Sequence, residues 1–140
     1  MAEVILLDAG PLVALMDHRE EHHAWAKSAF APLHLPLMTC QGALTEAFHL
    51  LRDQPSALAK LTRHVQVGHF VDALDFNAQA SRIAALMERY ANVPMSFTDA
   101  CLVAMSEAPS PSRILTLDSD FQIYRRQDGG PLALIAPFAA

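Results

Sequence analysis

Residues 4–11 read Val4-Ile5-Leu6-Leu7-Asp8-Ala9-Gly10-Pro11, and this segment indicates the fold class. Its first four residues form a continuous apolar run, as expected of a strand buried on both faces of a parallel sheet. Asp8 ends the run, and Gly10-Pro11 suits the passage from a loop into the first turn of a helix. A buried strand, an acid and a helix in this order predict the first unit of an α/β domain.

The rest of the chain repeats this alternation of strands and helices. Strands are predicted over residues 35–39, 70–71, 113–117 and 132–135. Helices are predicted over residues 21–30, 41–52, 55–67, 77–90 and 98–106, and the last is apolar nearly all round, as in a central buried helix. The order predicts an α/β sandwich with a mostly parallel sheet. A length of 140 residues fits a single domain over residues 1–140.

The composition favours a folded protein of the cell interior. Hydrophobic residues make up 52% of the chain and charged residues only 18%, which argues against disorder. No apolar run approaches the roughly 18 residues of a membrane helix, and the first residues do not resemble a signal peptide. Cys40 and Cys101 belong to no close-spaced cysteine motif, so reduced, buried thiols are favoured over a disulfide or a metal pair. We therefore expect a cytoplasmic protein without a membrane partner.

The charge of the chain limits how it could bind nucleic acid. A net charge of −5 argues against broad electrostatic attraction to phosphates. It leaves a nuclease open, because bound cations can offset an acidic catalytic centre. The basic residues that could contact a phosphate backbone, or simply keep the surface soluble, are Arg52, Lys60, Arg63, Arg125 and Arg126.

Four acidic residues stand where an α/β sheet gathers a ligand site. Asp8 and Asp118 each follow an apolar strand directly, so they should lie at the carboxyl edge of the sheet. Asp99 opens the most buried helix, and Glu46 lies beside the apolar stripe of its own helix. Clustered carboxylates repel one another, so such a group typically holds hard cations. No thiolate or imidazole accompanies them, which favours Mg²⁺ or Mn²⁺.

Each acid also has a purely structural interpretation. Asp8 and Asp118 could be helix N-caps, a position that aspartate favours. Ser96-Phe97-Thr98-Asp99 matches a capping box, in which Asp99 would bond back to the Ser96 backbone. Glu46 could be an ordinary solvated helix residue. Capping and metal binding are compatible for Asp99, since one residue could begin the helix and still point into the cleft.

Four segments together resemble the motifs of the PIN-domain family, and in particular the VapC-type toxins of bacterial toxin–antitoxin pairs. Leu6-Leu7-Asp8-Ala9-Gly10-Pro11-Leu12-Val13 is similar to the opening motif, and Thr45-Glu46 to the second acidic position. Ser96-Phe97-Thr98-Asp99-Ala100 resembles the third, and Thr116-Leu117-Asp118-Ser119-Asp120-Phe121 the fourth. Order and spacing agree over nearly the whole chain. One departure is that many relatives place a hydroxyl residue just after the first aspartate, where this chain has Ala9-Gly10.

The resemblance implies a three-layer α/β/α sandwich and a metal-dependent endoribonuclease that acts as the toxin of such a pair. Asp8, Glu46, Asp99 and Asp118 would be the catalytic residues and hold Mg²⁺ or Mn²⁺, directly or through water, with Asp120 as an auxiliary metal ligand. Water would attack the phosphodiester and leave 5′-phosphate and 3′-hydroxyl ends. The implied partners are an RNA substrate, an antitoxin protein and a second copy of the chain. The alternative is a silent PIN-fold module that binds RNA or protein without cutting.

Two other site types have weaker support. Residues 18–22 spell His-Arg-Glu-Glu-His, which matches the H-x-x-E-H pattern of a class of zinc peptidases. That site would need a continuous helix, capped by Asp17, and a third ligand downstream. A phosphorylation receiver domain would need a lysine late in the chain, whereas the only lysines are Lys27 and Lys60.

Overall fold

A parallel five-stranded sheet forms the centre of the computed structural model, which describes residues 2–139. Its strands are β1 (Val4–Leu7), β2 (Leu37–Thr39), β3 (Phe70–Asp72), β4 (Ser112–Leu115) and β5 (Leu134–Ile135), in the spatial order β3-β2-β1-β4-β5. Every pairing between neighbouring strands is parallel. The predicted α/β fold with a mostly parallel sheet is therefore confirmed.

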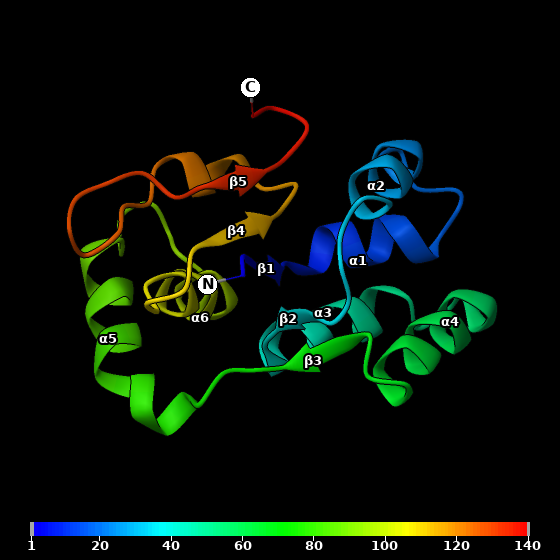
Figure 1. The fold of residues 1–140 in the computed structure, drawn as a ribbon, viewed down its shortest axis with the longest axis horizontal. Helices are drawn as coiled ribbons and strands as arrows, with labels where there is room; N and C mark the ends of the chain where they lie inside the picture. The colour runs from blue at the N-terminus through cyan, green and yellow to red at the C-terminus, as the bar shows by residue number, and fades with distance from the viewer. Residues whose placement is uncertain (1, 140) are drawn as a thin grey trace.

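Helices cover both faces of this sheet. They are α1 (Ala9–Met16), α2 (His23–Phe30), α3 (Gln41–Leu50), α4 (Pro55–Gln66), α5 (Phe76–Arg89) and α6 (Phe97–Ser106), with a 3₁₀ turn η1 (Ser119–Gln122). Figure 1 shows the strands stacked from β5 at the top to β3 at the bottom, with α5 and α6 on the left and α1, α2 and α4 on the right. The arrangement is the three-layer sandwich that the resemblance implied.

The alternation of side chains along β1 creates the two cores. Leu6 packs into the core on the side of α5 and α6, whereas Ile5 and Leu7 pack into the core on the side of α1 and α4. Helix α3 belongs to both, because it contributes Ala43 to the first core and Ala47 to the second. A strand buried on both faces needs the continuous apolar run that the sequence shows.

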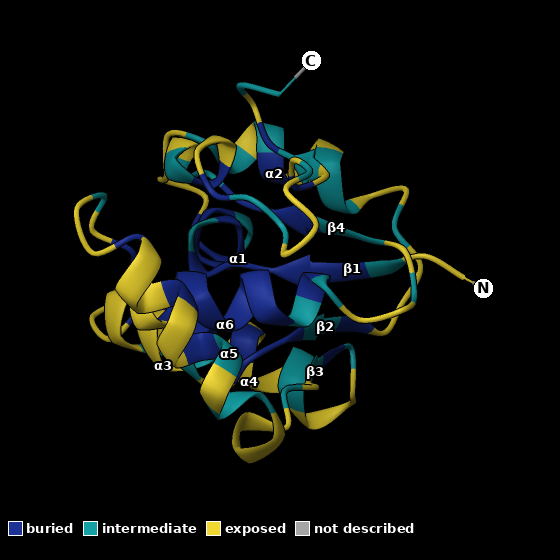
Figure 2. Ribbon diagram, turned by 90° about the vertical axis from the view of Figure 1, so that its left-hand side faces the viewer, coloured by how far each residue is buried: buried dark blue, intermediate teal, exposed yellow. Residues whose placement is uncertain are grey.

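Helix α6 is the most buried helix, as its apolar composition predicted. Eight of its ten residues are buried, and Figure 2 shows it in dark blue beside β1, while α3 carries an exposed face. Asp99 is one of the buried residues of α6. The helix that begins at the third predicted acidic motif is thus held rigidly by its surroundings on nearly every side.

The segment around residues 18–22 differs from the prediction. Helix α2 begins at His23 rather than near Glu21, and residues 18–22 form turns. Asp17 does not cap α2; it closes α1, and its Oδ1 accepts the backbone N–H of Arg19 at 3.0 Å. Its carboxylate also pairs with the Arg19 guanidinium at 3.2 Å. A zinc site of the H-x-x-E-H type needs a continuous helix here, so that alternative is wrong.

Within residues 2–139, none of the helices has the length and apolar character needed to cross a membrane.

Candidate active site

All five predicted acidic residues line one cleft at the carboxyl edge of the sheet. The cleft has a volume of about 370 Å³, and Asp8, Glu46, Asp99, Asp118 and Asp120 form its polar lining. Its remaining lining residues are Gly10, Pro94, Ser96 and Leu117. The five acids come from elements that are far apart in the sequence. One lies on α3, one on α6 and one on η1, and the other two follow β1 and β4. The expected convergence of the four motifs is therefore present.

Asp8 is buried, and its carboxylate accepts two hydrogen bonds. It is 8% exposed and caps α1, with Oδ1 accepting the backbone N–H of Ala9 at 2.8 Å. The hydroxyl of Thr116 donates to Oδ2 at 2.7 Å. Burial raises the pKa of Asp8 to about 6; the two hydrogen bonds work against the shift, and the carboxylates of Asp99 and Glu46 add to it. Asp8 is thus both a helix cap and a member of the acidic cluster.

Asp99 combines the same two roles at the start of α6. Its backbone N–H donates to Oγ of Ser96 at 3.0 Å, which is the hydroxyl half of the predicted capping box. Its Oδ2 accepts a hydrogen bond from the hydroxyl of Tyr124 at 2.7 Å. Burial raises the pKa of Asp99, hydrogen bonds from Tyr124 and Ser96 lower it, and the charge of Asp118 raises it further. The hydroxyl half of the predicted capping box is therefore present at a residue that also lines the cleft.

Asp118 and Asp120 lie on the turn that follows β4. Asp118 caps η1, because its Oδ1 accepts the backbone N–H of Asp120 at 2.9 Å. The N–H of Asp118 itself donates to Oγ of Thr116 at 3.0 Å. Glu46 lies on α3 with an exposed side chain, so it approaches the cleft from the solvent side.

The acidic cluster forms no ion pair with a basic side chain in the described part of the chain. Of the ion pairs among residues 2–139, none involves any of the five cleft acids. Taking a carboxylate out of water is unfavourable unless another charge or hydrogen-bond donors compensate it. Hydrogen bonds offset part of this cost for Asp8 and Asp99, and a bound cation would in addition relieve the repulsion between the acids.

The donor set fits Mg²⁺ or Mn²⁺ in its chemistry. The ligands available are carboxylate oxygens, which hard cations prefer. Among the described residues, no three His, Cys, Asp or Glu side chains stand close enough together to hold one ion between them. Mg²⁺ is commonly held by one or two carboxylates and keeps several waters. The residues therefore suit a partly hydrated ion better than an enclosed protein cage.

Two hydroxyl residues of the site were not predicted from the sequence. Thr116 supplies the hydroxyl contact to Asp8 that Ala9-Gly10 cannot make, and it does so from the end of β4. Thr116 belongs to the fourth motif, and its position two residues before Asp118 could have identified it from the sequence. Tyr124 lies outside all four motifs, and nothing local in the sequence connects it with Asp99.

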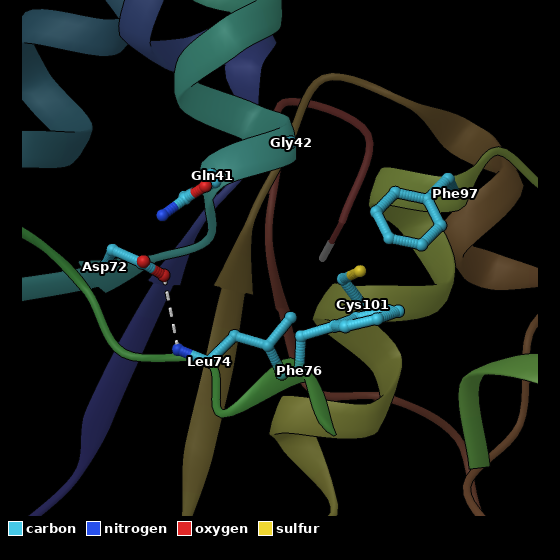
Figure 3. Close-up of a pocket in the computed structure, with 7 residues that line it drawn as sticks. All are labelled: Gln41, Gly42, Asp72, Leu74, Phe76, Phe97 and Cys101. Carbon is cyan, nitrogen blue, oxygen red and sulfur yellow. Dashed lines mark hydrogen bonds between the residues drawn. The ribbon is translucent and has the colours of Figure 1, made fainter. Parts of the chain in front are cut away.

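A second hollow lies beside the cleft. It has a volume of about 270 Å³ and is lined by Gln41, Gly42, Asp72, Leu74, Phe76, Phe97 and Cys101. Figure 3 shows the rings of Phe76 and Phe97 and the sulfur of Cys101 on one side, and Gln41 and Asp72 on the other. The two rings are 5.7 Å apart and nearly half exposed. Ser96 lines the cleft and Phe97 lines this hollow, so the two adjoin along the chain.

The cysteines and the basic residues lie in other surroundings. Cys40 and Cys101 are free and buried, as predicted, and burial raises the pKa of the Cys101 thiol to about 12. The Arg125 guanidinium donates to three backbone carbonyls around η1, and that of Arg126 lies 4.0 Å from the Asp128 carboxylate. Arg125 is thus engaged in holding its own turn, which weakens its interpretation as a phosphate ligand.

Comparison with known proteins places these observations in a family context. A PIN domain family model matches residues 5–127, a range that contains all five cleft acids. The matching solved structures include the Mycobacterium tuberculosis toxin VapC20, described as cleaving the sarcin-ricin loop. It has a TM-score of 0.70 and 18% sequence identity, covering 85% of this chain and 93% of that one. No curated protein matches the sequence significantly.

Proposed function

This chain belongs to the PIN domain family, and on that basis we propose that it is a Mg²⁺- or Mn²⁺-dependent endoribonuclease of the cytoplasm. We further propose that it is the toxin of a toxin–antitoxin pair. The observation that carries the nuclease proposal is the cleft itself. Five carboxylates from four separate motifs line it, and no basic side chain of the described chain pairs with any of them.

The buried acids of the cleft would hold the cation, and the exposed acid would accept a proton from the attacking water. Asp8 and Asp99 would be the main ligands, with Asp118 and Asp120 contributing from the turn after β4. A bound Mg²⁺ or Mn²⁺ would supply Lewis acidity toward the phosphodiester and toward water. Glu46, the acid of α3 with an exposed side chain, would accept the proton of the attacking water.

The bond changes define the products. The water oxygen forms a bond to phosphorus, and the bond between phosphorus and O3′ breaks with protonation of the leaving oxygen. The products therefore carry a 5′-phosphate and a 3′-hydroxyl. The 2′-hydroxyl takes no part in this step, so no 2′,3′-cyclic phosphate forms.

The decisive experiment is cleavage of a mixed pool of single-stranded RNA with mapping of the product ends. We expect cleavage with Mg²⁺ or Mn²⁺, loss of cleavage with chelator, and 5′-phosphate ends. The Asp8→Asn variant, prepared in the same way, controls for a contaminating nuclease and should be inactive. Cyclic phosphate ends, or equal cleavage by the variant, would contradict the proposal.

A binding module that does not cut is the second candidate. The observation in its favour is that, within residues 2–139, no three potential ligands already converge on one point. This candidate predicts RNA binding in a filter or anisotropy assay with no cleavage in either metal. Metal-dependent cleavage that disappears in the Asp8→Asn variant would exclude it.

The hollow beside the cleft offers a way to bind RNA despite the acidic charge. Nucleobases of single strands stack on aromatic side chains, and this contact does not depend on a basic surface. Phe76 and Phe97 present nearly half-exposed rings next to the acidic cleft. A strand crossing the cleft would place an unpaired base near these rings.

We also propose that the protein binds an antitoxin and forms a homodimer. An antitoxin segment carrying an Arg or Lys would enter the carboxylate cluster, which forms no ion pair within residues 2–139, and stop cleavage. Undiminished cleavage in the saturated complex would contradict this.

A homodimer would cover exposed apolar side chains such as Leu50, which is 53% exposed. Leu51 and Leu61 are fully buried and belong to the core, so they would not contribute to the dimer interface. Light scattering at micromolar concentration gives the mass.

A further inference from the structure

Tyr124, which lies three residues after the fourth motif, contacts Asp99 of the third motif through its side chain. It follows η1, is fully buried, and donates its hydroxyl hydrogen to Oδ2 of Asp99 at 2.7 Å. The two residues are 25 positions apart in the sequence. Asp99 lines the cleft, whereas Tyr124 does not. The Tyr124 side chain therefore reaches the cleft through the Asp99 carboxylate that its hydroxyl contacts.

Packing fixes the Tyr124 ring independently of its hydroxyl group. The ring meets Phe121 edge-on at 5.3 Å and Tyr90 at 5.1 Å between centroids. The Tyr90 hydroxyl takes no part in this ring packing, because it accepts the backbone N–H of Arg125 at 2.8 Å. A ring held on several sides presents its hydroxyl at a fixed point.

A fixed donor on one carboxylate oxygen limits how the carboxylate can turn. Asp99 is surrounded by other acids, and repulsion from Asp118 and Asp8 would otherwise favour rotation away from them. A hydrogen bond to a ligating carboxylate orients it toward the metal and typically alters metal affinity 10- to 100-fold when removed. The contact made by Tyr124 has the geometry for this role.

We propose that Tyr124 is a positioning residue, which holds the Asp99 carboxylate in the orientation that receives the divalent cation. The inference rests on the proposed metal-dependent function of the cleft. Tyr124 contacts neither the cation nor the RNA, and acts only by restricting Asp99. Its contribution should therefore appear first in metal affinity, before any effect on the affinity for RNA.

The chain offers a matched pair of variants for the test. Tyr124→Phe removes the hydroxyl that contacts Asp99 and keeps the ring packing. Tyr90→Phe removes a hydroxyl from the neighbouring ring of the same aromatic cluster, one that accepts from a backbone N–H and touches no cleft acid in the described chain. Both are buried tyrosines, so a general loss of packing or of one hydrogen bond should affect them alike.

Mn²⁺ binding to the RNA-free protein is measured by calorimetry for wild type and both variants, alongside thermal melts with chelator. We expect Tyr124→Phe to weaken Mn²⁺ binding about 10-fold or more, and Tyr90→Phe to leave it within twofold of wild type. The Mn²⁺ midpoint for RNA cleavage should shift by the same factor in Tyr124→Phe, with an unchanged KM for RNA at saturating metal. The melts verify that both variants fold.

The possible results distinguish a failure of the proposed role of Tyr124 from a failure of the proposed metal-dependent function. Equal Mn²⁺ affinity of wild type and Tyr124→Phe, or an equal loss in both variants, would overturn the role of Tyr124 while leaving the metal site intact. Absence of Mn²⁺ binding to the wild type would overturn both. A double variant, Asp99→Asn with Tyr124→Phe, should bind metal no more weakly than Asp99→Asn alone, because the partner has been removed. A further loss in the double variant would place the effect elsewhere.

Discussion

Thr116 joins the first and last acidic motifs, because its hydroxyl donates to Oδ2 of Asp8 at 2.7 Å while accepting the N–H of Asp118 at 3.0 Å. The residues Asp8 and Thr116 are 108 positions apart and end neighbouring parallel strands. One hydroxyl therefore uses its donor on a buried carboxylate and its acceptor on the turn that carries Asp118. The contact gives Asp8 a hydroxyl partner that Ala9 and Gly10 cannot supply.

Replacing Thr116 by valine should disturb both halves of that contact. The variant keeps the shape of the side chain but leaves one Asp8 oxygen and the Asp118 N–H without their partner. We expect a loss of about 1–3 kcal/mol in unfolding free energy, because buried polar groups are left unpaired. Cleavage should fall by about 10-fold or more, as for other partners of metal ligands. Thr116→Ser keeps the hydroxyl and should restore most of the activity in the same assay; an inactive serine variant would contradict this account.

The raised pKa of Asp8 predicts how stability depends on pH in the metal-free protein. Its pKa is about 6 in the folded state, against an ordinary 3.8, so the folded state binds more protons between these values. The stabilising contribution of the protonated group is full below pH 4 and is lost as pH rises through about 6. The total is about 3 kcal/mol at most, at about 1.36 kcal/mol for each pKa unit.

Denaturant unfolding in chelator between pH 4 and pH 8 measures this contribution. The wild type should lose stability across that window relative to Asp8→Asn, whose side chain does not titrate. Mg²⁺ should oppose the loss, because it binds the ionised carboxylates and competes with protons. Parallel pH profiles for the two proteins would show that Asp8 does not titrate in this range.

Asp99→Asn separates a metal ligand from a helix cap. If Asp99 only caps α6, the change should cost a few tenths to about 1 kcal/mol and leave nuclease activity nearly unchanged. As a ligand within the acidic cluster, its neutralisation should abolish cleavage. It should also relieve repulsion in the metal-free protein, giving an equal or higher melting temperature.

Melts with chelator and with excess Mg²⁺ measure both effects of this change. Mg²⁺ should raise the melting temperature of the wild type more than that of Asp99→Asn, since a ligand that binds more tightly stabilises the folded state more at the same concentration. A variant that is clearly less stable without metal and still cuts RNA would refute the metal role of Asp99.

Phe76→Ala tests the aromatic hollow as part of the RNA site. Loss of a stacked base costs about 1–3 kcal/mol, so RNA affinity should fall roughly 5- to 150-fold. Binding is measured by anisotropy in the Asp99→Asn background to prevent cleavage. Val67→Ala, another exposed apolar residue but at the end of α4, is the control and should bind normally. Unchanged RNA affinity together with a halved mass in light scattering would assign the hollow to a subunit interface instead.

Local patterns in the sequence were sufficient for the architecture and for the position of the acids. The apolar run before Asp8 predicts a strand buried on both faces, and the carboxyl ends of parallel strands share one edge. Asp8 and Asp118 therefore had to lie at the same edge of a parallel sheet, whereas their closeness depends on β1 and β4 being neighbours, which the folded structure decides. The all-round apolar character of residues 98–106 likewise predicted the burial of the helix that begins beside Asp99.

Other features were decided only when distant segments came together. One local prediction also failed: Asp17 does not cap a helix, because Arg19, two residues away, holds its carboxylate in a turn. The contact of Tyr124 with Asp99 depends on how η1 and the chain after it fold back over α6. The spacing of apolar residues along a helix or strand indicates which of its faces is buried, because side chains return to the same face at a regular interval. A single hydrogen bond between remote side chains leaves no such repeat, so the hydroxyls that hold Asp8 and Asp99 became visible only in the folded chain.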